Sequence, residues 1–235
     1  MYTDPRRKQG SQQEVSRVKQ LSPTTWVVSG YHNYQLSYPT HVTPKKQASK
    51  YAMIFRHLQE LQKTNTSLVD LGCANGLICF LAKEAGFSKV LGLDHDVAYI
   101  NQLTALRTAQ VDWKSLEFKQ FVFKLGNLDA KLKADVAVAG ALVHWLYSAT
   151  AGFGSLKKII QYLSEFTKNA FLVEWVAPND PAIRQLGHIR MHPEYHTDPY
   201  SHQHFIEALT ETFGKPPTLI HKFTSTRWLY KTSWM

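Results

Sequence analysis

Short apolar runs alternate with helix-like repeats through the central and C-terminal parts of the chain. Short apolar runs have the length of buried strands, whereas apolar residues that recur every three or four positions predict helices with one buried face. The pattern predicts strands at 68–71, 90–93, 118–123, 135–140 and 170–176, separated by helices that include 77–85, 97–109 and 154–166. Strands that alternate with helices in this way indicate an α/β fold with a parallel sheet.

Further segments flank this pattern at both ends. Apolar residues at helical spacing predict an amphipathic helix over 45–62 and a last helix over 200–213. Residues 217–224 and 227–234 then predict a hairpin-like strand pair joined at 225–226. The parallel strands and this C-terminal antiparallel pair together predict a doubly wound, seven-stranded sheet.

The turn after the first parallel strand carries the most informative residues. Gly72, Ala74 and Gly76 follow one another at two-residue spacing, and small residues allow a sharp turn and close approach of a ligand to the backbone. Asp94 ends the next strand, where an acid can accept hydrogen bonds from both hydroxyls of a ribose. The stretch therefore predicts a nucleoside-containing ligand at the carboxyl edge of the sheet. The alternative is a generic α/β turn that binds no ligand.

The run Asp70-Leu-Gly-Cys-Ala-Asn-Gly76 differs from a dinucleotide-binding loop and begins with an acid, whose carboxylate suits an ammonium group better than a pyrophosphate. It resembles motif I of the class I S-adenosylmethionine-dependent methyltransferases, and Gly92-Leu-Asp94 resembles their motif II. The resemblance implies a Rossmann-like methyltransferase fold that binds S-adenosyl-L-methionine. The residues that we expect at this cofactor are Asp70, Gly72, Cys73, Ala74, Gly76, Asp94, His95, Asn127, Leu128 and Ala141.

The adenine end of the cofactor is expected near Gly126-Asn-Leu-Asp129. Asn127 or Asp129 can hydrogen-bond the adenine amino group, and Leu128 can pack on the ring. Asn and Asp are also common in αβ loops that bind nothing, so a plain connecting loop is the alternative.

Two residues are candidates for the chemistry. The loop after the fourth strand lies beside the first strand in a doubly wound sheet, so it is expected to face the reacting methyl group. His144 in this loop is the candidate general base, because a neutral histidine can take a proton from a hydroxyl acceptor. The alternative for His144 is a core histidine bonded to a backbone carbonyl. Glu174 is the second candidate, since a glutamate inside an apolar strand needs a partner for its charge.

Aromatic residues near these loops are candidates for acceptor binding, because aromatic faces also favour a nearby sulfonium cation. The candidates are Tyr31, His32, Trp145, Tyr147 and Trp175. For the aromatic stretch 25–36, packing on the edge of the sheet is an equal alternative. Lys45, Lys46 and Lys50 begin the amphipathic helix and can face a substrate, although exposed lysines usually have no specific role.

The acceptor class follows partly from what the sequence lacks. It has no Asp/Asn-Pro-Pro-aromatic run, no Pro-Cys nucleophile, and no aspartate at the end of the fourth strand. These signatures accompany several nucleic-acid methyltransferases, so small-molecule or saccharide acceptors are favoured. Segments 31–36, 174–180 and 226–230 are similar to bacterial methyltransferases that act on polysaccharides, O-antigens or nodulation factors. We therefore expect methyl transfer to an oxygen or nitrogen of such an acceptor.

Charge modifies this picture only at the N-terminus. The net charge of +9 is concentrated in residues 1–63, with ten Lys/Arg and three Asp/Glu, whereas residues 64–235 carry seventeen and fifteen. We expect a basic N-terminal extension with a flanking helix over 1–63, flexible over 1–20, followed by a methyltransferase domain over 64–235. A basic arm can attract RNA. RNA methylation is thus one alternative, and a non-catalytic binding protein on this scaffold is another.

The remaining composition indicates a cytoplasmic protein with one sizeable core. Hydrophobic residues make up 44% of the chain, and no segment has the length of a membrane span or the apolar core of a signal peptide. Cys73 and Cys79 are expected to be small buried side chains rather than a disulfide. The histidines of 188–204 match no zinc spacing, so we expect no metal, and this stretch is interpreted as a polar substrate lid.

Overall fold

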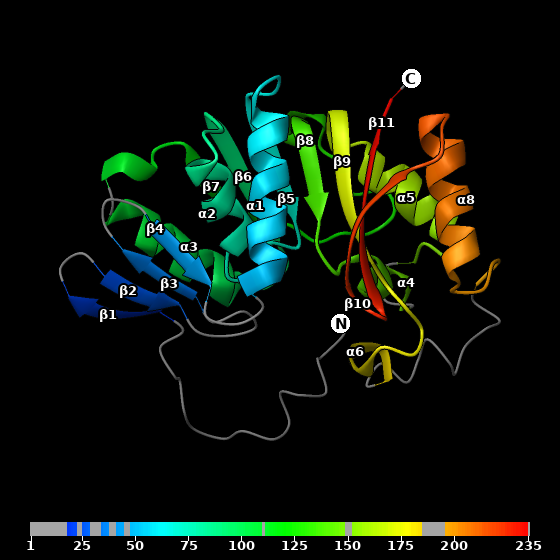
Figure 1. Cartoon of the computed structure of the whole chain (residues 1–235), viewed down its shortest axis with the longest axis horizontal. Coiled ribbons are helices and arrows are strands. Elements are labelled where there is room, and N and C mark those ends of the chain that lie inside the picture. Colours follow the sequence, from blue (N-terminus) through cyan, green and yellow to red (C-terminus); the bar gives the residue numbers. More distant parts are fainter. Residues whose placement is uncertain are drawn as a thin grey trace.

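The computed structural model shows a central sheet flanked by helices (Figure 1). The structure describes residues 18–22, 25–28, 34–37, 41–44, 48–109, 111–148, 152–184 and 196–234.

A seven-stranded sheet forms the centre of the molecule, in the order β10-β11-β9-β8-β5-β6-β7. The five strands β5 to β9 run parallel, whereas β11 is antiparallel to both β9 and β10. Their bounds are β5 Ser67–Leu71, β6 Lys89–Asp94, β7 Leu116–Gln120, β8 Ala134–Ala139, β9 Thr167–Val176, β10 Thr218–Thr224 and β11 Arg227–Ser233. The expected doubly wound sheet with a C-terminal antiparallel pair is confirmed. The main difference is β7, which lies slightly earlier than expected.

Helices cover both faces of this sheet (Figure 1). One apolar core joins the sheet to α1, α2 and α3, and a second joins its other face to α4, α5 and α8. The helices are α1 Ala48–Gln62, α2 Leu77–Glu84, α3 Val97–Thr108, α4 Val143–Tyr147, α5 Leu156–Ser164, α6 Pro181–Arg184 and α8 His202–Phe213, with short 3-10 turns η2 Val111–Trp113 and η3 Ala130–Leu132. Strand alternation divides the side chains between the two cores: Leu68 enters the first and Val69 the second.

Polar side chains define where three of the helices begin. The carboxylate of Asp96 accepts a hydrogen bond from the Ala98 amide and starts α3. Ser155 and Ser201 serve α5 and α8 in the same way. A side-chain oxygen at this position satisfies an amide that the helix itself leaves unpaired, so these sequence positions set the helix boundaries.

A small antiparallel sheet precedes the main domain and was not predicted from the sequence. Its strands pair in sequential order: β1 Val18–Ser22, β2 Thr25–Val28, β3 Tyr34–Ser37 and β4 His41–Pro44. Val28 is buried in the same core as α1, so this sheet is attached to the main fold. Of the stretch expected to be flexible, residues 18–20 lie in β1, and residues 1–17 are outside the described part. A domain boundary after residue 63 stays a prediction.

None of the described helices is both long enough and apolar enough to cross a membrane.

Candidate active site

The turn between β5 and α2 has a backbone conformation that requires small residues. Gly72 and Gly76 have φ angles of 76° and 78°, and Ala74 has 46°, a left-handed region that favours glycine. A Cβ on Gly76 would lie 2.8 Å from Cδ2 of Leu103. The amides of Gly72 and Cys73 both donate to the Leu93 carbonyl, at 2.8 and 2.9 Å. The turn is therefore held tightly against the end of β6.

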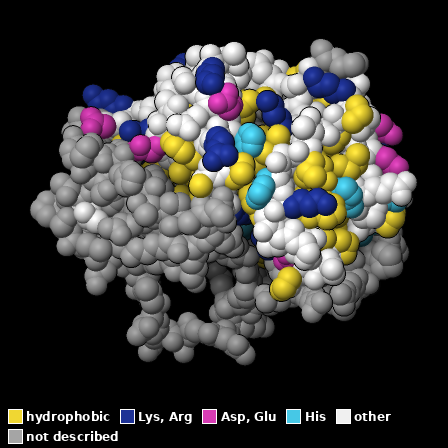
Figure 2. Space-filling view, in the orientation of Figure 1, with side chains coloured by type: hydrophobic (Ala, Val, Ile, Leu, Met, Phe, Trp, Pro, Cys, Tyr) yellow, Lys and Arg dark blue, Asp and Glu magenta, His cyan; other side chains and the backbone are white. Residues whose placement is uncertain are grey.

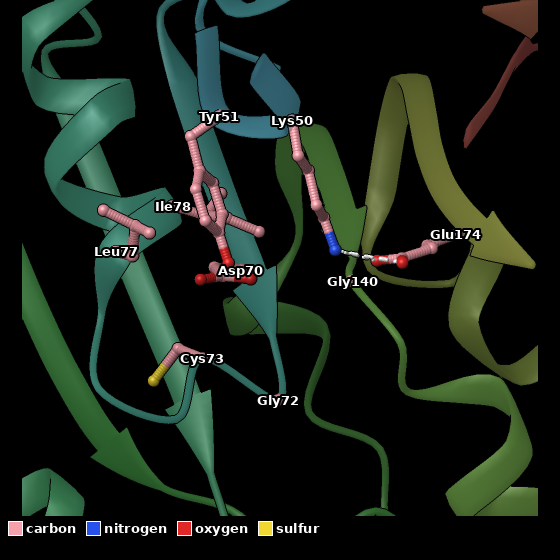
Figure 3. Close-up of a pocket in the computed structure, with 9 residues that line it drawn as sticks. All are labelled: Lys50, Tyr51, Asp70, Gly72, Cys73, Leu77, Ile78, Gly140 and Glu174. Atoms are coloured by element: carbon pink, nitrogen blue, oxygen red, sulfur yellow. Dashed lines mark hydrogen bonds and ion pairs between the residues drawn. The ribbon is translucent and has the colours of Figure 1, made fainter. Parts of the chain in front are cut away.

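A cleft opens beside this turn, at the carboxyl edge of the sheet between β5 and β8. The strand order reverses at this point, because β5 is followed in the chain by β6 on one side but adjoins β8 on the other. Such switch points are where open α/β sheets bind ligands. The cleft is lined by residues from α1, β5 and the turn after it, α2, the end of β9 and the position that follows β8 (Figure 3): Lys50, Tyr51, Asp70, Gly72, Cys73, Leu77, Ile78, Gly140 and Glu174.

Asp70 places a carboxyl group on the wall of the cleft. Burial raises the pKa of Asp70 from 3.8 to about 7, an effect that the Cys79 thiol at 3.5 Å opposes and the charge of Asp94 reinforces. Tyr51 points toward the same carboxyl group (Figure 3). A buried acid with a pKa near neutrality is favourable for a cationic ligand, because a nearby positive charge stabilises its ionised form.

Asp94 links the turn to the end of β6. One of its carboxylate oxygens accepts from the Ala74 amide at 2.8 Å, and the other accepts from the Asp96 amide at 2.9 Å. Each oxygen has a further lone pair with which it can accept from a ligand hydroxyl. His95, the next residue, is mostly exposed, and its Nδ1 lies 3.3 Å from Asp94. The structure therefore brings Asp70, Asp94 and the small-residue turn together, as the sequence predicted.

A buried ion pair on the opposite wall was not predicted. Lys50 Nζ donates to both carboxylate oxygens of Glu174, at 2.9 and 2.8 Å, across 124 positions of sequence. Arg227 Nη1 lies 3.7 Å from the same glutamate, and Arg227 forms a two-bond pair with Asp180 at 3.0 Å for each bond. The buried carboxylate of Glu174 is therefore paired with a cation, the ammonium group of Lys50 in α1. The signal in the sequence was the position of Lys50 on the same stripe as Ile54.

His144 lies in α4, whose preceding turn packs against the small-residue turn. A Cβ on Gly72 would be 3.1 Å from Cδ1 of Leu142, and Ala141 has a strained φ of 49°. His144 is 2% exposed, and neither ring nitrogen has a hydrogen-bond partner among the described residues. Burial, assisted by the charge of Arg227 and opposed by Asp180, lowers the pKa of His144 to about 3. It is therefore a neutral side chain with unused hydrogen-bonding capacity.

Comparison with solved structures identifies the fold. The chain resembles the bifunctional kinase-methyltransferase WbdD (18% identity over 81% of this chain and 40% of WbdD, TM-score 0.58). It also resembles magnesium protoporphyrin IX methyltransferase ChlM from Synechocystis PCC 6803 with bound SAH (14% identity over 79% of this chain and 84% of ChlM, TM-score 0.51). A third similar structure is the methyltransferase domain of bacterial CtHen1-C (14% identity over 79% and 98%, TM-score 0.58).

The chain has the class I methyltransferase fold. The strand order and the antiparallel C-terminal pair agree with this assignment, which confirms the predicted resemblance at the level of the fold. No protein-family model and no curated protein matches the sequence. The chain spans 40% of the length of WbdD.

The loop that follows β7 in this methyltransferase fold contains Asn127 and Leu128. The Asn127 side-chain amide donates to the Val122 carbonyl at 2.6 Å, and its backbone carbonyl accepts from the Tyr162 hydroxyl. Leu128 is 46% exposed and is available for contact with a flat ring. Asn127 thus holds the loop together, and an adenine contact by Leu128 stays a prediction.

The aromatic residues expected at the acceptor lie in different environments. Trp175 is completely buried and stacks on Tyr200 with ring centroids 4.6 Å apart, on the opposite face of β9 from Glu174. Tyr147 is also buried and donates to the Asp198 carbonyl. These positions are those of core residues and count against acceptor contact. Trp145 is partly exposed. Tyr31 and His32 lie outside the described residues, so their role stays a prediction.

The histidine-rich C-terminal segment is only partly described. His196 stacks on Tyr147 at 4.0 Å, and His202 Nε2 lies 2.6 Å from the Tyr230 hydroxyl. In the described ranges, no cluster of three or more His, Cys, Asp or Glu side chains is arranged to hold a metal ion. His188 and His192 lie outside those ranges, and residues 196–204 are the described part of the predicted substrate lid. The lid itself stays a prediction.

Proposed function

We propose that the protein transfers a methyl group from S-adenosyl-L-methionine to an oxygen or nitrogen of a small-molecule or saccharide acceptor. The observation that carries the proposal is the cleft at the switch point of a methyltransferase fold, with an acid on one wall, a lysine on the other and a second acid at the end of the adjacent strand.

The charged side chains of the cleft are complementary to the amino-acid end and to the ribose of this cofactor. Its amino-acid end carries an ammonium and a carboxylate, which find opposite charges at Asp70 and Lys50. Its ribose hydroxyls find the carboxylate of Asp94. The glycine at position 140 leaves space between these groups, since a Cβ there would lie 3.2 Å from Cδ1 of Ile78. The residues present therefore fit the cofactor.

The cofactor, when bound, supplies an electrophilic methyl group. The contribution of the protein is then to hold the acceptor at attack distance in a water-poor cleft. His144 is neutral at pH 7 because its pKa is about 3, and it can accept a hydrogen bond from an acceptor hydroxyl or amine. Its low pKa makes it a weak base, and it lies outside the lining of the cleft. We therefore propose only a positioning role for it, through a hydrogen bond to an acceptor that reaches α4. Glu174, which lines the cleft, is the other candidate for this contact.

Calorimetric titration with S-adenosylmethionine and S-adenosylhomocysteine tests the proposal. We expect micromolar-range binding by the wild-type protein and a loss of roughly 10- to 100-fold in Asp94→Ala, the effect of removing a hydrogen bond to a charged group. Asp112→Ala is the matched control, because this acid is exposed in η2, and it should bind like wild type. No binding by folded wild-type protein would overturn the enzyme assignment and favour a non-catalytic scaffold.

Binding would justify an acceptor screen over nucleotide-sugars, glycans and tRNA. On the face shown in Figure 2, the described Lys and Arg side chains are interspersed with histidine and hydrophobic side chains, so this face adds no support for RNA. Methyl incorporation into a saccharide or small molecule is the expected result. Incorporation into tRNA, with steeply salt-dependent binding, would contradict the proposed acceptor class.

A further inference from the structure

The ion pair between Lys50 and Glu174 occupies the wall of the cleft itself. Both residues line the cleft, and the lysine ammonium points across to the glutamate (Figure 3). Their side chains are only 8% and 2% exposed. Lys50 comes from α1 and Glu174 from β9, so the pair also links the N-terminal helix to the sheet. A purely structural ion pair between α1 and the sheet would not need to line a cleft, so its position indicates a role in ligand binding.

The two partners differ in what else surrounds them. Glu174 has a second cation nearby, since Arg227 lies 3.7 Å away and is itself held by Asp180. Beyond Glu174, the described surroundings of Lys50 include the rings of Phe223 and Tyr51, at 5.1 and 5.8 Å from Nζ. Rings offer a cation far less than a carboxylate does in a buried site. Glu174 can therefore lose Lys50 and keep a cation, whereas Lys50 needs a new anion in exchange.

We propose that the cofactor carboxylate replaces Glu174 as the partner of Lys50, an inference that rests on the proposed function. Cofactor binding then releases Glu174, which stays beside Arg227 and close to Gly140, where a Cβ would lie 4.0 Å from its Oε2. In that position the freed carboxylate oxygens can accept a hydrogen bond from the acceptor. The exchange makes the acceptor site complete only after the cofactor is in place, so the cofactor binds first.

The exchange has a counterintuitive consequence. In the wild-type protein the ligand carboxylate competes with Glu174 for one ammonium group. Glu174→Gln removes the competing charge and leaves Lys50 without a carboxylate until the ligand arrives. Hydrogen bonds to charged groups are among the stronger ones in proteins, so this variant should bind S-adenosylhomocysteine roughly tenfold or more tightly than wild type. 5′-Methylthioadenosine has no amino-acid end, so its affinity should not change.

The experiment is a calorimetric matrix of two ligands and three proteins. S-Adenosylhomocysteine and 5′-methylthioadenosine are titrated into wild type, Glu174→Gln and Lys50→Met, after thermal unfolding confirms that each is folded. We expect tighter S-adenosylhomocysteine binding in Glu174→Gln, weaker binding in Lys50→Met, and equal 5′-methylthioadenosine binding in all three. If Glu174→Gln does not fold, Lys50→Met still tests the contact between the lysine and the ligand carboxylate, on which the exchange depends, because an equal loss for both ligands would refute it.

Two outcomes would overturn the inference. Unchanged or weaker S-adenosylhomocysteine binding in Glu174→Gln would show that the ligand does not compete with the glutamate. Equal losses for both ligands in Lys50→Met would show that the pair is structural. Failure of the proposed function is a different result, because wild type would then bind neither ligand.

Discussion

Replacing Asp70 by Asn should stabilise the empty protein and weaken cofactor binding. Folding raises the pKa of this carboxyl from 3.8 to about 7, a difference of roughly three pKa units or about 4 kcal/mol. An acid whose pKa is raised on folding holds its proton more tightly in the folded state. The free energy of unfolding therefore falls as the pH rises from about 4 to about 7, and the penalty is complete above that range. The neutral carboxamide of Asn avoids it.

Ligand binding should follow the opposite direction. The ammonium group of the cofactor stabilises ionised Asp70, so binding near pH 7 releases a proton and the affinity rises with pH through about 7. Asp70→Asn should bind S-adenosylhomocysteine more weakly and release no proton from this position. The unfolding free energies of both proteins, measured by denaturation at pH 5 and pH 8, give the first effect. Calorimetry at pH 7 in two buffers with different ionisation enthalpies gives the second.

Either of two results would refute this reasoning. The first is an unfolding free energy that changes in parallel for wild type and Asp70→Asn between pH 5 and pH 8. The second is a binding enthalpy that is the same in both buffers. Either would mean that Asp70 is already ionised in the empty cleft, and that its environment is more polar than the burial of the side chain indicates.

Three further changes test the fold that supports the cleft, each by denaturation. Asp135→Asn should lower the free energy of unfolding by about 1–3 kcal/mol at pH 7. Burial alone would raise the pKa of Asp135, but hydrogen bonds from residues 66–67, three of them 3.0 Å long, outweigh it and lower the pKa. The difference from wild type should therefore shrink as the pH falls below about 4, and a constant difference would contradict this explanation. Gly92→Ala should cost about 1–3 kcal/mol, since the new Cβ would lie 2.7 Å from Cδ1 of Phe118, and an unchanged stability would show that the neighbours yield. His144→Leu should make stability less sensitive to acid. The pKa of His144 is about 3 in the folded state and 6.5 in the unfolded chain, so wild type loses stability as the pH falls from 6.5 toward 3. Equal acid sensitivity of the two proteins would be evidence against a buried, neutral histidine.

Local sequence was sufficient for the geometry of the turn and of Asp94, where we propose that the cofactor binds. The strand, turn and helix around Gly72 and the acid at Asp94 lie close together in the chain, and their residue types determine their geometry directly. The apolar runs likewise predicted the layers of the fold, because a strand that is apolar on both faces must be covered by helices on both sides of a parallel sheet.

Long-range pairing was the part that sequence could not supply. Lys50 and Glu174 form an ion pair although they are 124 positions apart in the sequence. The residues around each of them give no indication of its partner. Strand alternation predicts that Glu174 and Trp175 face opposite ways, but only the packed helices decide which of them faces the cleft. The small sheet over 18–44 was missed because its four- and five-residue strands are too short to show a clear alternation.

A crystal structure of the full chain with S-adenosylhomocysteine tests the central claim most directly. We expect the ribose at Asp94 and the amino-acid end between Asp70 and Lys50, with Glu174 separated from the lysine and still beside Arg227. A ligand bound elsewhere on the molecule, or a cleft that stays closed by the Lys50–Glu174 pair at saturating ligand, would contradict it.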